Sequence, residues 1–595
     1  MSKGGVSKDA RSATSQNLQH QALDTPRPPL AYVAPRRIMG QGMRTETYDY
    51  LIVGAGSAGC VLASRLSEEN GVTVLVLEAG PSDRTWKIHM PAALTYNLCD
   101  DKYNWAYETE PQAHMDGRRM YWPRGRVLGG SSSLNAMVYV RGHALDYDRW
   151  AGNRLPEWSY AHVLPYFKRA ETRETGGDAY RGSSGPLQVS TGSQKNPLFD
   201  AFIEAGLQAG YPFTADMNGY QQEGFGRMDM TIHRGRRWSA ARAYLHPAMA
   251  RPNLTVETGA FCSRILFEGR RAVGVAFRQK GRMREVRAAR EVILAGGAIN
   301  SPQLLLLSGI GPADEIGRHG IKVIHDLPGV GRNLQDHLEL YVQYACTQPI
   351  TLYITENPLQ RVRIGLEWFL LKRGLATSAH LEAGAFIRRN AAVPHPDLQY
   401  HFLPSLVNDH GRQKIGRHAF QAHVGPMRPT SVGYLRLRSA DPSVHPEIQP
   451  NYLATEQDRL EMRDAVKLTR EIFAQPAFDP YRGEEIQPGA AVTTDAEIDA
   501  FVRARSDSAY HPSCTCKMGE DEMAVVDGEL RVRGLEALRV VDASIMPDVV
   551  SGNLNAPTIM IAEKAADMIR GRSKLAPEYA PVYVPPRTER AKAAG

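Results

Sequence analysis

Three glycines and one carboxylate near the start of the chain have the spacing of a dinucleotide-binding site. Gly54, Gly56 and Gly59 follow an apolar run in the pattern G-x-G-x-x-G, and Glu78 comes 19 residues after the last of them. Glycines with this spacing allow a tight turn, a close approach of the backbone to a pyrophosphate, and close packing of helix on strand. A carboxylate near this offset can accept a hydrogen bond from a ribose hydroxyl. The pattern predicts a bound dinucleotide, and the alternative is a glycine-rich turn with a structural role.

A β–α–β unit must hold these residues in place. Apolar runs at 50–53 and 72–77 predict two buried strands, and the residues between them have a helical pattern of apolar positions. Further apolar runs that end in small residues occur at 291–294 and 538–541. Because these segments lie far apart in the sequence, we predict an α/β fold with a Rossmann-like, doubly wound sheet assembled from discontinuous segments.

Length and composition exclude several classes of protein. The chain has 595 residues, of which 43% are hydrophobic, which predicts two or more cores or one large domain with a second one inserted. The net charge of +7 is not concentrated in lysine runs interleaved with aromatic residues, so no nucleic acid partner is expected. Six cysteines do not form a disulfide framework, and Cys514 and Cys516 lack the further ligands of a zinc site, so no metal is predicted. No apolar run of about 18 residues occurs, so any membrane association would be peripheral.

Four ordered motifs extend from the β–α–β unit to the end of the chain. They are that unit, a Gly-Gly-Ser-Ser loop within 125–138, a turn and helix at 297–311, and the late pair His511 and Asn555. Together they resemble the glucose–methanol–choline (GMC) family of flavin oxidoreductases, over about residues 48–572. Stretches within 104–108, 509–519 and 541–547 are most similar to family members that oxidise choline. The resemblance implies FAD as the cofactor and hydride transfer from an alcohol carbon to flavin N5.

The same motifs divide the chain into parts. Residues 1–46 form a basic extension, read either as a mitochondrial transit segment or as a plain disordered extension. Strand-like stretches with polar alternation after about residue 338 predict an antiparallel sheet in a second domain. The expected division is an FAD-binding domain at 47–335 with inserted segments at about 150–250, a substrate-binding domain with an antiparallel sheet and helices at 336–505, a return to the FAD-binding domain at 506–572, and a flexible tail at 573–595.

The resemblance implies three groups of residues around FAD. The ADP half would contact Gly54, Gly56, Ser57, Ala58, Gly59 and Glu78. The isoalloxazine ring would lie near Gly129, Gly130, Asn135, Ala136, Met137 and Val138. The ribityl chain and pyrophosphate would lie beside Asp542 and Ala543. NAD as the sole cofactor is the competing interpretation, and the Gly-Gly-Ser loop and the late strand favour the longer flavin molecule. Leu134 replaces the histidine that attaches the flavin in related choline oxidases, so the resemblance implies a non-covalent cofactor.

His511 is the candidate catalytic base. A neutral imidazole can take the hydroxyl proton of an alcohol near neutral pH. His511 lies in a Tyr-His-Pro context shortly before the late strand, which distinguishes it from the other histidines. By the resemblance, Asn555 would hydrogen-bond the substrate oxygen beside it. The alternative for Asn555 is a cap or turn residue ahead of Pro557.

Glu382 is the candidate partner of a cationic substrate. It is the one acid in the apolar stretch 379–386. A buried carboxylate is costly unless it is paired, and a quaternary ammonium group would supply the missing charge. Tyr510 could add an aromatic face for a cation–π contact, and His401 is a further candidate for substrate binding. The alternative for Glu382 is an internal salt bridge to an arginine.

These residues lead to one expected activity and two alternatives. We expect FAD-dependent oxidation of choline to betaine aldehyde, with continued oxidation to glycine betaine as an extension. The electrons would pass to a respiratory-chain quinone or another acceptor. One alternative is oxidation of another primary alcohol by a dehydrogenase or oxidase, and the other is a flavin-fold binding protein without activity. The expected location is the mitochondrion, at the inner membrane, and the alternative is a bacterial cytoplasm or membrane.

Overall fold

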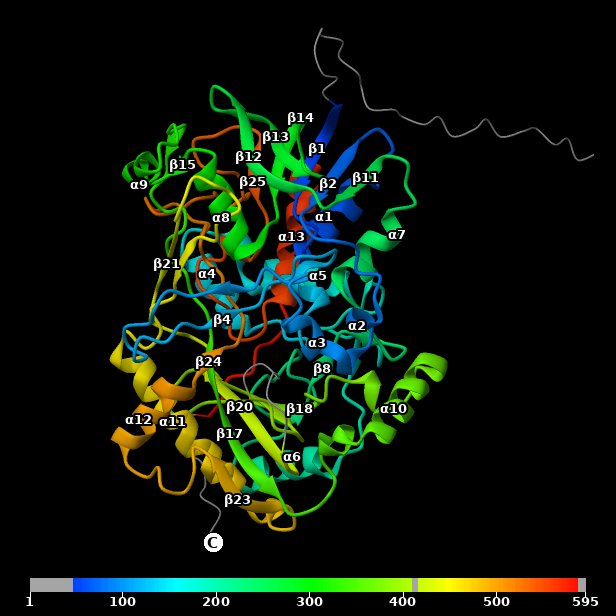
Figure 1. Cartoon of the computed structure of the whole chain (residues 1–595), viewed down its shortest axis with the longest axis vertical. Coiled ribbons are helices and arrows are strands. Elements are labelled where there is room, and N and C mark those ends of the chain that lie inside the picture. Colours follow the sequence, from blue (N-terminus) through cyan, green and yellow to red (C-terminus); the bar gives the residue numbers. More distant parts are fainter. Residues whose placement is uncertain (1–45, 409–415, 587–595) are drawn as a thin grey trace, which may run out of the picture.

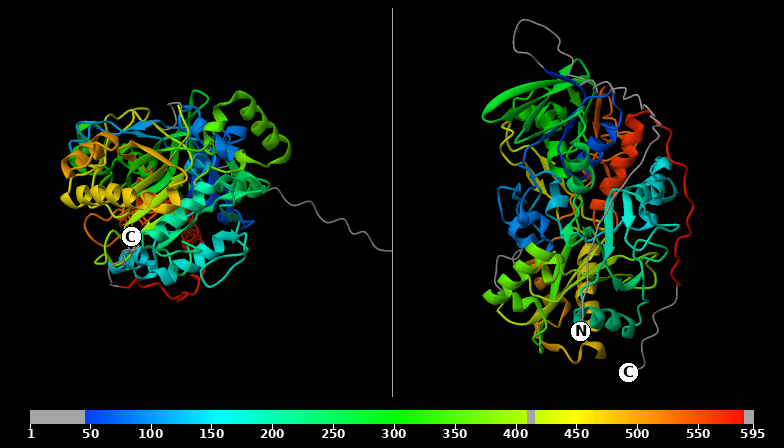
Figure 2. Two further views of the ribbon diagram at one scale, coloured as in Figure 1. Left: turned by 90° about the horizontal axis from the view of Figure 1, so that it is seen from below. Right: turned by 90° about the vertical axis from the view of Figure 1, so that its right-hand side faces the viewer.

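A computed structural model describes residues 46–408 and 416–586 of the chain. The molecule is elongated, with one large sheet in the upper half and a second one in the lower half (Figure 1). The chain crosses between the two halves several times, so both ends of the sequence contribute to the upper half (Figure 2). Apart from Glu46, the basic extension at 1–46 lies outside the described residues.

The upper sheet has the predicted doubly wound character. Its order is β11-β2-β1-β14-β13-β12, and β25 pairs with the C-terminal end of β14, beyond the part of β14 that pairs with β13. Five of its strands run parallel to one another: β1 (Glu46–Val53), β2 (Val74–Glu78), β11 (Leu254–Thr258), β14 (Arg282–Leu294) and β25 (Leu538–Val540). β12 (Phe261–Glu268) and β13 (Arg271–Gln279) form an antiparallel extension. The segments that form the sheet are thus as discontinuous as the sequence predicted.

The lower sheet is antiparallel throughout, which confirms the expected antiparallel sheet. Its order is β23-β17-β20-β19-β18-β7, and β24 pairs with the start of β17. The strands are β7 (Gly224–Arg227), β17 (Leu338–Cys346), β18 (Ala383–Ile387), β19 (Leu398–Leu403), β20 (Ala419–Pro426), β23 (Arg482–Gln487) and β24 (Asp507–Ser508). β7 comes from the segment at about 150–250, so this segment contributes to the second sheet and is not confined to an insertion in the first.

Helices cover one face of the lower sheet. α6 (Pro197–Gln208) and α11 (Glu456–Phe473) pack on it. An aromatic cluster fills the layer between them, in which Phe202 stacks on Phe402 at 4.8 Å and Phe420 meets Phe473 at 5.3 Å between ring centroids. The opposite face of the sheet is therefore free to form one wall of a cavity.

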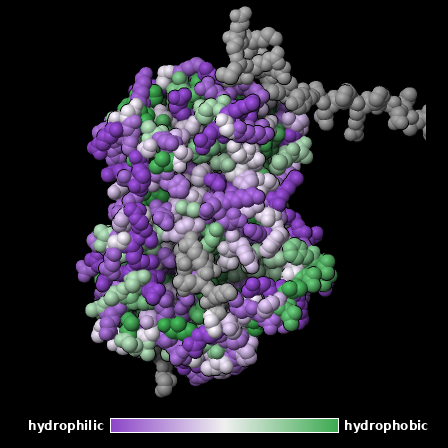
Figure 3. Space-filling view, in the orientation of Figure 1, coloured by the Kyte–Doolittle hydropathy of each residue, from purple (hydrophilic) through white to green (hydrophobic). Residues whose placement is uncertain are grey.

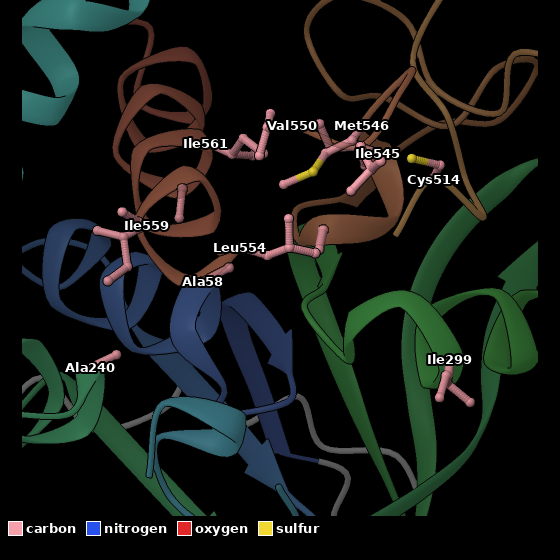
Figure 4. Packing of buried hydrophobic residues seen from close by; sticks show 14 of the residues in the cluster. Ala58, Ala240, Ile299, Cys514, Ile545, Met546, Val550, Leu554, Ile559 and Ile561 are labelled. Atoms are coloured by element: carbon pink, nitrogen blue, oxygen red, sulfur yellow. The ribbon is translucent and has the colours of Figure 1, made fainter. Parts of the chain in front are cut away.

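The last helix ties the C-terminal segment to the first β–α–β unit. α13 (Asn555–Ile569) packs on α1 (Ser57–Leu66), and both are almost wholly buried. Figure 4 shows Ile559 and Ile561 of α13 in the same apolar core as Ala58 of α1, with Ile545 and Met546 nearby. Burying this apolar surface stabilises the fold only when the two ends of the chain come together.

Shorter elements connect these layers. The remaining helices are α2 (Trp86–His89), α3 (Leu94–Leu98), α4 (Ala144–Gly152), α5 (Tyr160–Ala170), α7 (His246–Ala248), α8 (Gly297–Leu307), α9 (Ala313–Arg318), α10 (Pro358–Leu371) and α12 (Asp495–Arg505). The remaining strands are β3 (Tyr107–Glu108), β4 (Tyr121–Trp122), β5 (Glu171–Arg173), β6 (Leu187–Thr191), β8 (Asp229–Met230), β9 (Ile232–His233), β10 (Arg236–Arg237), β15 (Ile310–Gly311), β16 (His325–Asp326), β21 (Tyr434–Arg436) and β22 (Glu447–Gln449). The described part of the predicted tail, 573–586, lies on the surface, where Lys168 pairs with Glu578 at 2.5 Å. Within the described residues no helix is both long and apolar enough to cross a membrane.

Gly59 shows why the turn after β1 requires glycine. A Cβ atom at this position would lie 1.9 Å from the carbonyl oxygen of Gly54, which is far inside van der Waals contact. The first turn of α1 can therefore approach β1 only without a side chain at this position.

The first prediction concerns this contact. We expect Gly59→Ala to destabilise the protein by about 1–3 kcal/mol, the usual cost of overpacking a tight site, and to reduce the amount of flavin that copurifies. Thermal unfolding and visible flavin absorbance per protein measure both effects. Gly152→Ala is the matched control, because a Cβ atom there meets no heavy atom within 4 Å. Equal behaviour of the two variants would contradict the packing argument.

Candidate active site

One cavity of about 810 Å³ joins the two sheets. Its upper end lies at the β1–α1 turn and its lower end lies against β17, β19 and β20. Most of the predicted site residues line it: Gly54, Gly56, Ser57, Ala58, Glu78, Gly130, Asn135, Ala136, Met137, Val138, His401, Tyr510, His511, Asp542, Ala543 and Asn555. Gly59 and Gly129 lie just behind the wall, and Gly129 donates its N–H to the carbonyl of Ala55 at 2.8 Å. Of the predicted residues, Glu382 alone is placed in a separate environment.

Glu78 is held at the upper end of the cavity by backbone groups. Its two carboxylate oxygens accept hydrogen bonds from the N–H groups of Ala55 and Gly80, each at 2.8 Å. Burial raises the pKa of Glu78 to about 7, and the two N–H donors oppose this rise. Since each carboxylate oxygen has a second lone pair, Glu78 can still accept a hydrogen bond from a ribose hydroxyl.

The turns around the upper end fit a dinucleotide. Gly130 has a left-handed φ of +52°, and a Cβ atom there would lie 2.7 Å from the Cα atom of Gly56, so two loops meet backbone to backbone. The N-terminus of α1 has no side-chain cap, which leaves its first N–H groups available for a phosphate. Asp542 braces the turn before α8 by accepting hydrogen bonds from Gly297 N at 2.8 Å and Ser301 Oγ at 2.5 Å. Leu134 also lines the cavity, and its aliphatic side chain has no group that could bond covalently to a flavin.

A pair of buried histidines lies further along the cavity. His337 Nε2 lies 3.0 Å from the carbonyl oxygen of Met427, so this nitrogen must carry a proton. His337 Nδ1 is then an acceptor, and His511 Nδ1, which lies 2.9 Å away, must be the donor. His511 Nε2 is consequently unprotonated and can act as a base.

Asn553, and not Asn555, lies beside this nitrogen. The Nδ2 group of Asn553 donates to His511 Nε2 at 3.1 Å, and its Oδ1 accepts from Gln399 Nε2 at 3.0 Å. Asn555 is the first residue of α13, and its Oδ1 accepts from Ser57 Oγ at 2.7 Å, at the dinucleotide end of the cavity. The position predicted for Asn555 is thus occupied by the asparagine two residues earlier. The sequence contains both asparagines, but only the start of α13 decides which one faces His511.

The surroundings of His511 keep it neutral. Burial, together with the nearby His337, His401 and Arg124, lowers the pKa of His511 well below its ordinary value. Its backbone N–H donates to Asp336 Oδ1 at 2.6 Å, and burial raises the pKa of Asp336 to about 6. Tyr510 precedes it with a left-handed φ of 63°, a conformation that non-glycine residues adopt at a cost. The chain therefore holds His511 in place from both its ring and its backbone.

Glu382 does not face the cavity. Its Oε2 accepts the backbone N–H of Gln194 at 2.5 Å, and the side chain of Ser378 and the backbone of Ser193 supply further hydrogen bonds. Burial nevertheless raises its pKa. Hydrogen-bond donors of the protein therefore satisfy this carboxylate, and no cationic ligand is needed. Within the described residues, the salt bridge to an arginine that was the predicted alternative is not formed either.

Glu339 is the acid that the sequence analysis missed. It lies on β17 and lines the cavity, and its carboxylate is 3.2 Å from His423 Nδ1. Burial opposes its ionisation, but the neighbouring His423 and His401 hold the pKa of Glu339 below its usual value. The aromatic rings of Tyr341 and Tyr510 line the same region. The signal in the sequence is period-two alternation in β17, which places Glu339 and Tyr341 on the face opposite Leu340 and Val342.

The cavity therefore combines a dinucleotide cradle, a neutral imidazole base with an amide donor beside it, and an ionised carboxylate among aromatic rings. Such a site can bind a dinucleotide and remove a proton from a small cationic molecule. No group of three or more histidine, cysteine or acidic side chains is placed to hold a metal ion in the described part of the chain.

Comparisons with known proteins agree with this arrangement. Two GMC oxidoreductase family models match residues 48–339 and 429–562. The chain is 63% identical to "Choline dehydrogenase, mitochondrial" of Homo sapiens, over 91% of this chain and 92% of that protein. It is 56% identical to "Oxygen-dependent choline dehydrogenase" of Burkholderia multivorans, over 91% and 97% of the two chains.

Solved structures show the same fold. Pyridoxine 4-oxidase from Mesorbium loti is 34% identical, with a TM-score of 0.81 over 88% of this chain and 100% of that one. Formate oxidase from Aspergillus oryzae, whose structure concerns modification of its FAD, is 28% identical, with a TM-score of 0.83 over 88% and 98%. Since the family models match most of the chain and the residues of the cavity fit the cofactor, the chain belongs to the GMC oxidoreductase family and is an FAD-dependent oxidoreductase.

Proposed function

We propose that this enzyme oxidises choline to betaine aldehyde. The observation that carries the proposal is the carboxylate of Glu339, which faces the same cavity as His511 and keeps its charge although desolvation opposes its ionisation. The choline dehydrogenases to which the chain is 56–63% identical support the same substrate. Oxidation of another primary alcohol is the second candidate, but a neutral alcohol would gain nothing from the charge of Glu339 in the cavity.

Each residue of the lower cavity has a role in this proposal. His511 Nε2 accepts the hydroxyl proton, because it is the unprotonated nitrogen of a neutral ring. Asn553 Nδ2 donates to that nitrogen before substrate binds. When substrate is bound, it donates to the substrate oxygen instead and stabilises the negative charge that develops there. FAD, when bound beside residues 135–138, supplies the ring that accepts the hydride.

The trimethylammonium group is proposed to lie between Glu339 and the aromatic rings of Tyr341 and Tyr510. A carboxylate attracts a cation strongly where water does not screen the charges, and the faces of aromatic rings add to that attraction. His401 lies on β19, which β20 separates from β17, and its Nε2 is 3.2 Å from Gln399 Nε2. It is proposed to shape this end of the cavity rather than to exchange a proton, because burial lowers its pKa to about 4.

Several further assignments rest on the same relatives. Hydrated betaine aldehyde again presents a hydroxyl group, so His511 could serve a second oxidation to glycine betaine in the same way. The two relatives named as mitochondrial, from Homo sapiens and Mus musculus, support a mitochondrial location, with the basic residues 1–46 as a transit segment. The bacterial relatives support the alternative of a bacterial cell. A respiratory-chain quinone is the proposed electron acceptor, at the inner membrane.

The second prediction separates the two asparagines. We expect His511→Ala to fold, to retain its flavin and to lose about 10²–10⁴-fold in the rate of flavin reduction by choline. Asn553→Ala should lose about 10²–10³-fold, since it removes one donor to the developing negative charge. Asn555→Ala, the matched control, should weaken flavin retention and leave the reduction rate of the flavin-loaded fraction close to wild type. Stopped-flow reduction measures all three, and a larger rate loss for Asn555→Ala than for Asn553→Ala would reverse the assignment.

The third prediction concerns the two buried acids. Glu339→Gln should weaken choline binding by about 2–5 kcal/mol, as is usual when one member of a buried charge pair is truncated. The neutral isostere 3,3-dimethylbutan-1-ol should lose far less, so the preference for choline over the isostere should collapse. Glu382→Gln removes the other acid and should leave that preference unchanged, because Glu382 does not line the cavity and its partners are backbone N–H groups and the Ser378 side chain. Dissociation constants from flavin spectra provide the test, and an unchanged preference in Glu339→Gln would place the cation elsewhere.

The fourth prediction concerns pH. Burial lowers the pKa values of His337, His380 and His401 to about 4, below the ordinary value of 6.5. The unfolded chain therefore binds these protons first, so stability is present above about pH 6.5 and is lost as the pH falls towards about 4. We expect the thermal midpoint to fall over this window and to fall less steeply in His401→Gln. A midpoint that stays constant through the window would show that these imidazoles are not neutral and buried.

A further inference from the structure

α10 exposes an unusual amount of apolar surface for a helix on the outside of a protein. Leu359 is 80% exposed and Leu370 is 76% exposed, and Val362, Leu366 and Leu371 are each at least half exposed. Leu359, Val362, Leu366 and Leu370 recur at helical spacing, so these four residues form one stripe along the helix. Figure 3 shows the stripe as a hydrophobic patch on the outer edge of the lower half, where α10 projects from the body in Figure 1.

The opposite side of α10 belongs to the cavity. Ile364, Gly365 and Phe369 line the cavity that contains His511, while Trp368 is buried and donates to the carbonyl of Gly235 at 2.7 Å. α10 is thus apolar on both sides, which in a soluble protein is the character of a buried helix. Something apolar is therefore expected to cover its outer side.

Exposed aromatic residues surround the opening of the cavity beside this helix. Trp86 and Tyr96, from α2 and α3, are both exposed and both line the cavity, so the cavity reaches the surface there. The ring of Trp86 contacts Tyr96 and Phe369, each at 5.9 Å between centroids. Tryptophan and tyrosine are enriched where proteins meet the headgroup region of a bilayer.

Basic residues flank the apolar stripe. Arg363 and Arg373 are exposed, and neither has an ion pair within the described residues, while Lys372 lies over the ring of Trp368. Arg361 is partly neutralised by Glu356 at 3.6 Å, and Glu367 is the one acid within the helix. An apolar stripe with arginines beside it is the pattern of helices that lie in the surface of an anionic membrane.

We propose that α10, with Trp86 and Tyr96, docks the enzyme on an anionic lipid bilayer so that the cavity opens directly into the membrane surface. A helix of 14 residues is about 21 Å long, too short to span a bilayer, but its stripe can lie flat among the headgroups. The opening then admits a lipid-soluble quinone. Alcohol oxidation leaves two electrons and two protons on the enzyme, and a quinone that takes both becomes a hydroquinone. This second step rests on the proposed function, whereas the docking does not.

Vesicle flotation of the flavin-loaded full-length enzyme tests the docking. The probes are vesicles of phosphatidylcholine alone and of phosphatidylcholine mixed with phosphatidylglycerol. Wild type should float with the mixed vesicles. The variant L359Q/L366Q/L370Q, whose three side chains do not line the cavity, should lose at least about a hundredfold in partition, because each buried leucine contributes about 1.5–3 kcal/mol. R363Q/R373Q should lose about fivefold per arginine, and only with the anionic vesicles.

A matched control replaces exposed apolar residues elsewhere. The variant M249Q/M283Q/V323Q should float as wild type does, since these residues lie outside α10. Choline oxidation with a water-soluble dye as acceptor should be unchanged in L359Q/L366Q/L370Q, while reduction of a long-chain quinone held in mixed vesicles should fall. Absence of choline oxidation with the dye in wild type would overturn the proposed function and leave flotation as an independent result.

Two outcomes would overturn the docking. One is flotation of L359Q/L366Q/L370Q equal to that of wild type. The other is a wild type that does not float with the mixed vesicles and that forms dimers without lipid, by light scattering, while the variant is monomeric. The stripe would then be an interface between copies of this chain.

Discussion

The lower half of the cavity depends on one hydrogen bond between two buried imidazoles. Met427 fixes the proton of His337 on Nε2, and the contact of 2.9 Å between the two Nδ1 atoms then fixes the proton of His511 on Nδ1. Only one assignment of protons satisfies this chain of contacts, so the lone pair of His511 Nε2 must point to Asn553. The unprotonated state of the proposed base therefore depends on the carbonyl of Met427, the residue directly after β20, which bonds to His337 and not to His511 itself.

The pleat of the lower sheet turns that hydrogen-bond chain into a site. Side chains alternate between the two faces of a strand, so β17 sends Leu340 and Val342 towards the aromatic core and Glu339 and Tyr341 towards the cavity. Register across the strands then brings the acid and its partners together, because His423 pairs with Tyr341 on β17 and with His401 on β19. A shift of one residue in any of these strands would exchange the two faces. The helices behind the sheet, α6 and α11, stabilise that register from the other side.

The residues in the upper half of the cavity could be predicted from the sequence, and those in the lower half much less so, for physical reasons. Gly54, Gly56, Gly59 and Glu78 lie within one β–α–β unit, so their spacing alone defines their geometry. Glu382 was predicted to bind the substrate because it is an acid in an apolar stretch. Its hydrogen-bond donor, Gln194 N, lies 188 residues away in the sequence, so the local sequence does not reveal it. Which of Asn553 and Asn555 faces His511 depends on where α13 begins. Whether Glu339 faces the cavity depends on which face of β17 lines it. Both are decided by tertiary packing.

Burial alone does not determine what an acid in this cavity does, because three buried acids of one chain behave differently. Glu78 meets two backbone N–H groups and no facing cation of comparable strength, so its pKa rises to about 7. Asp336 accepts from Ser508, Tyr452 and the backbone of His511, and its pKa rises to about 6. Glu339 faces His423 and His401, and its pKa falls below the usual value although desolvation opposes its ionisation. Neutral donors can support a hydroxyl contact or a structural hydrogen bond, but only the acid that keeps its charge can attract a cation. Asp336 does not line the cavity, whereas Glu339 lines it beside the rings of Tyr341 and Tyr510 and keeps its charge, so Glu339 is the acid that we propose attracts a charged alcohol.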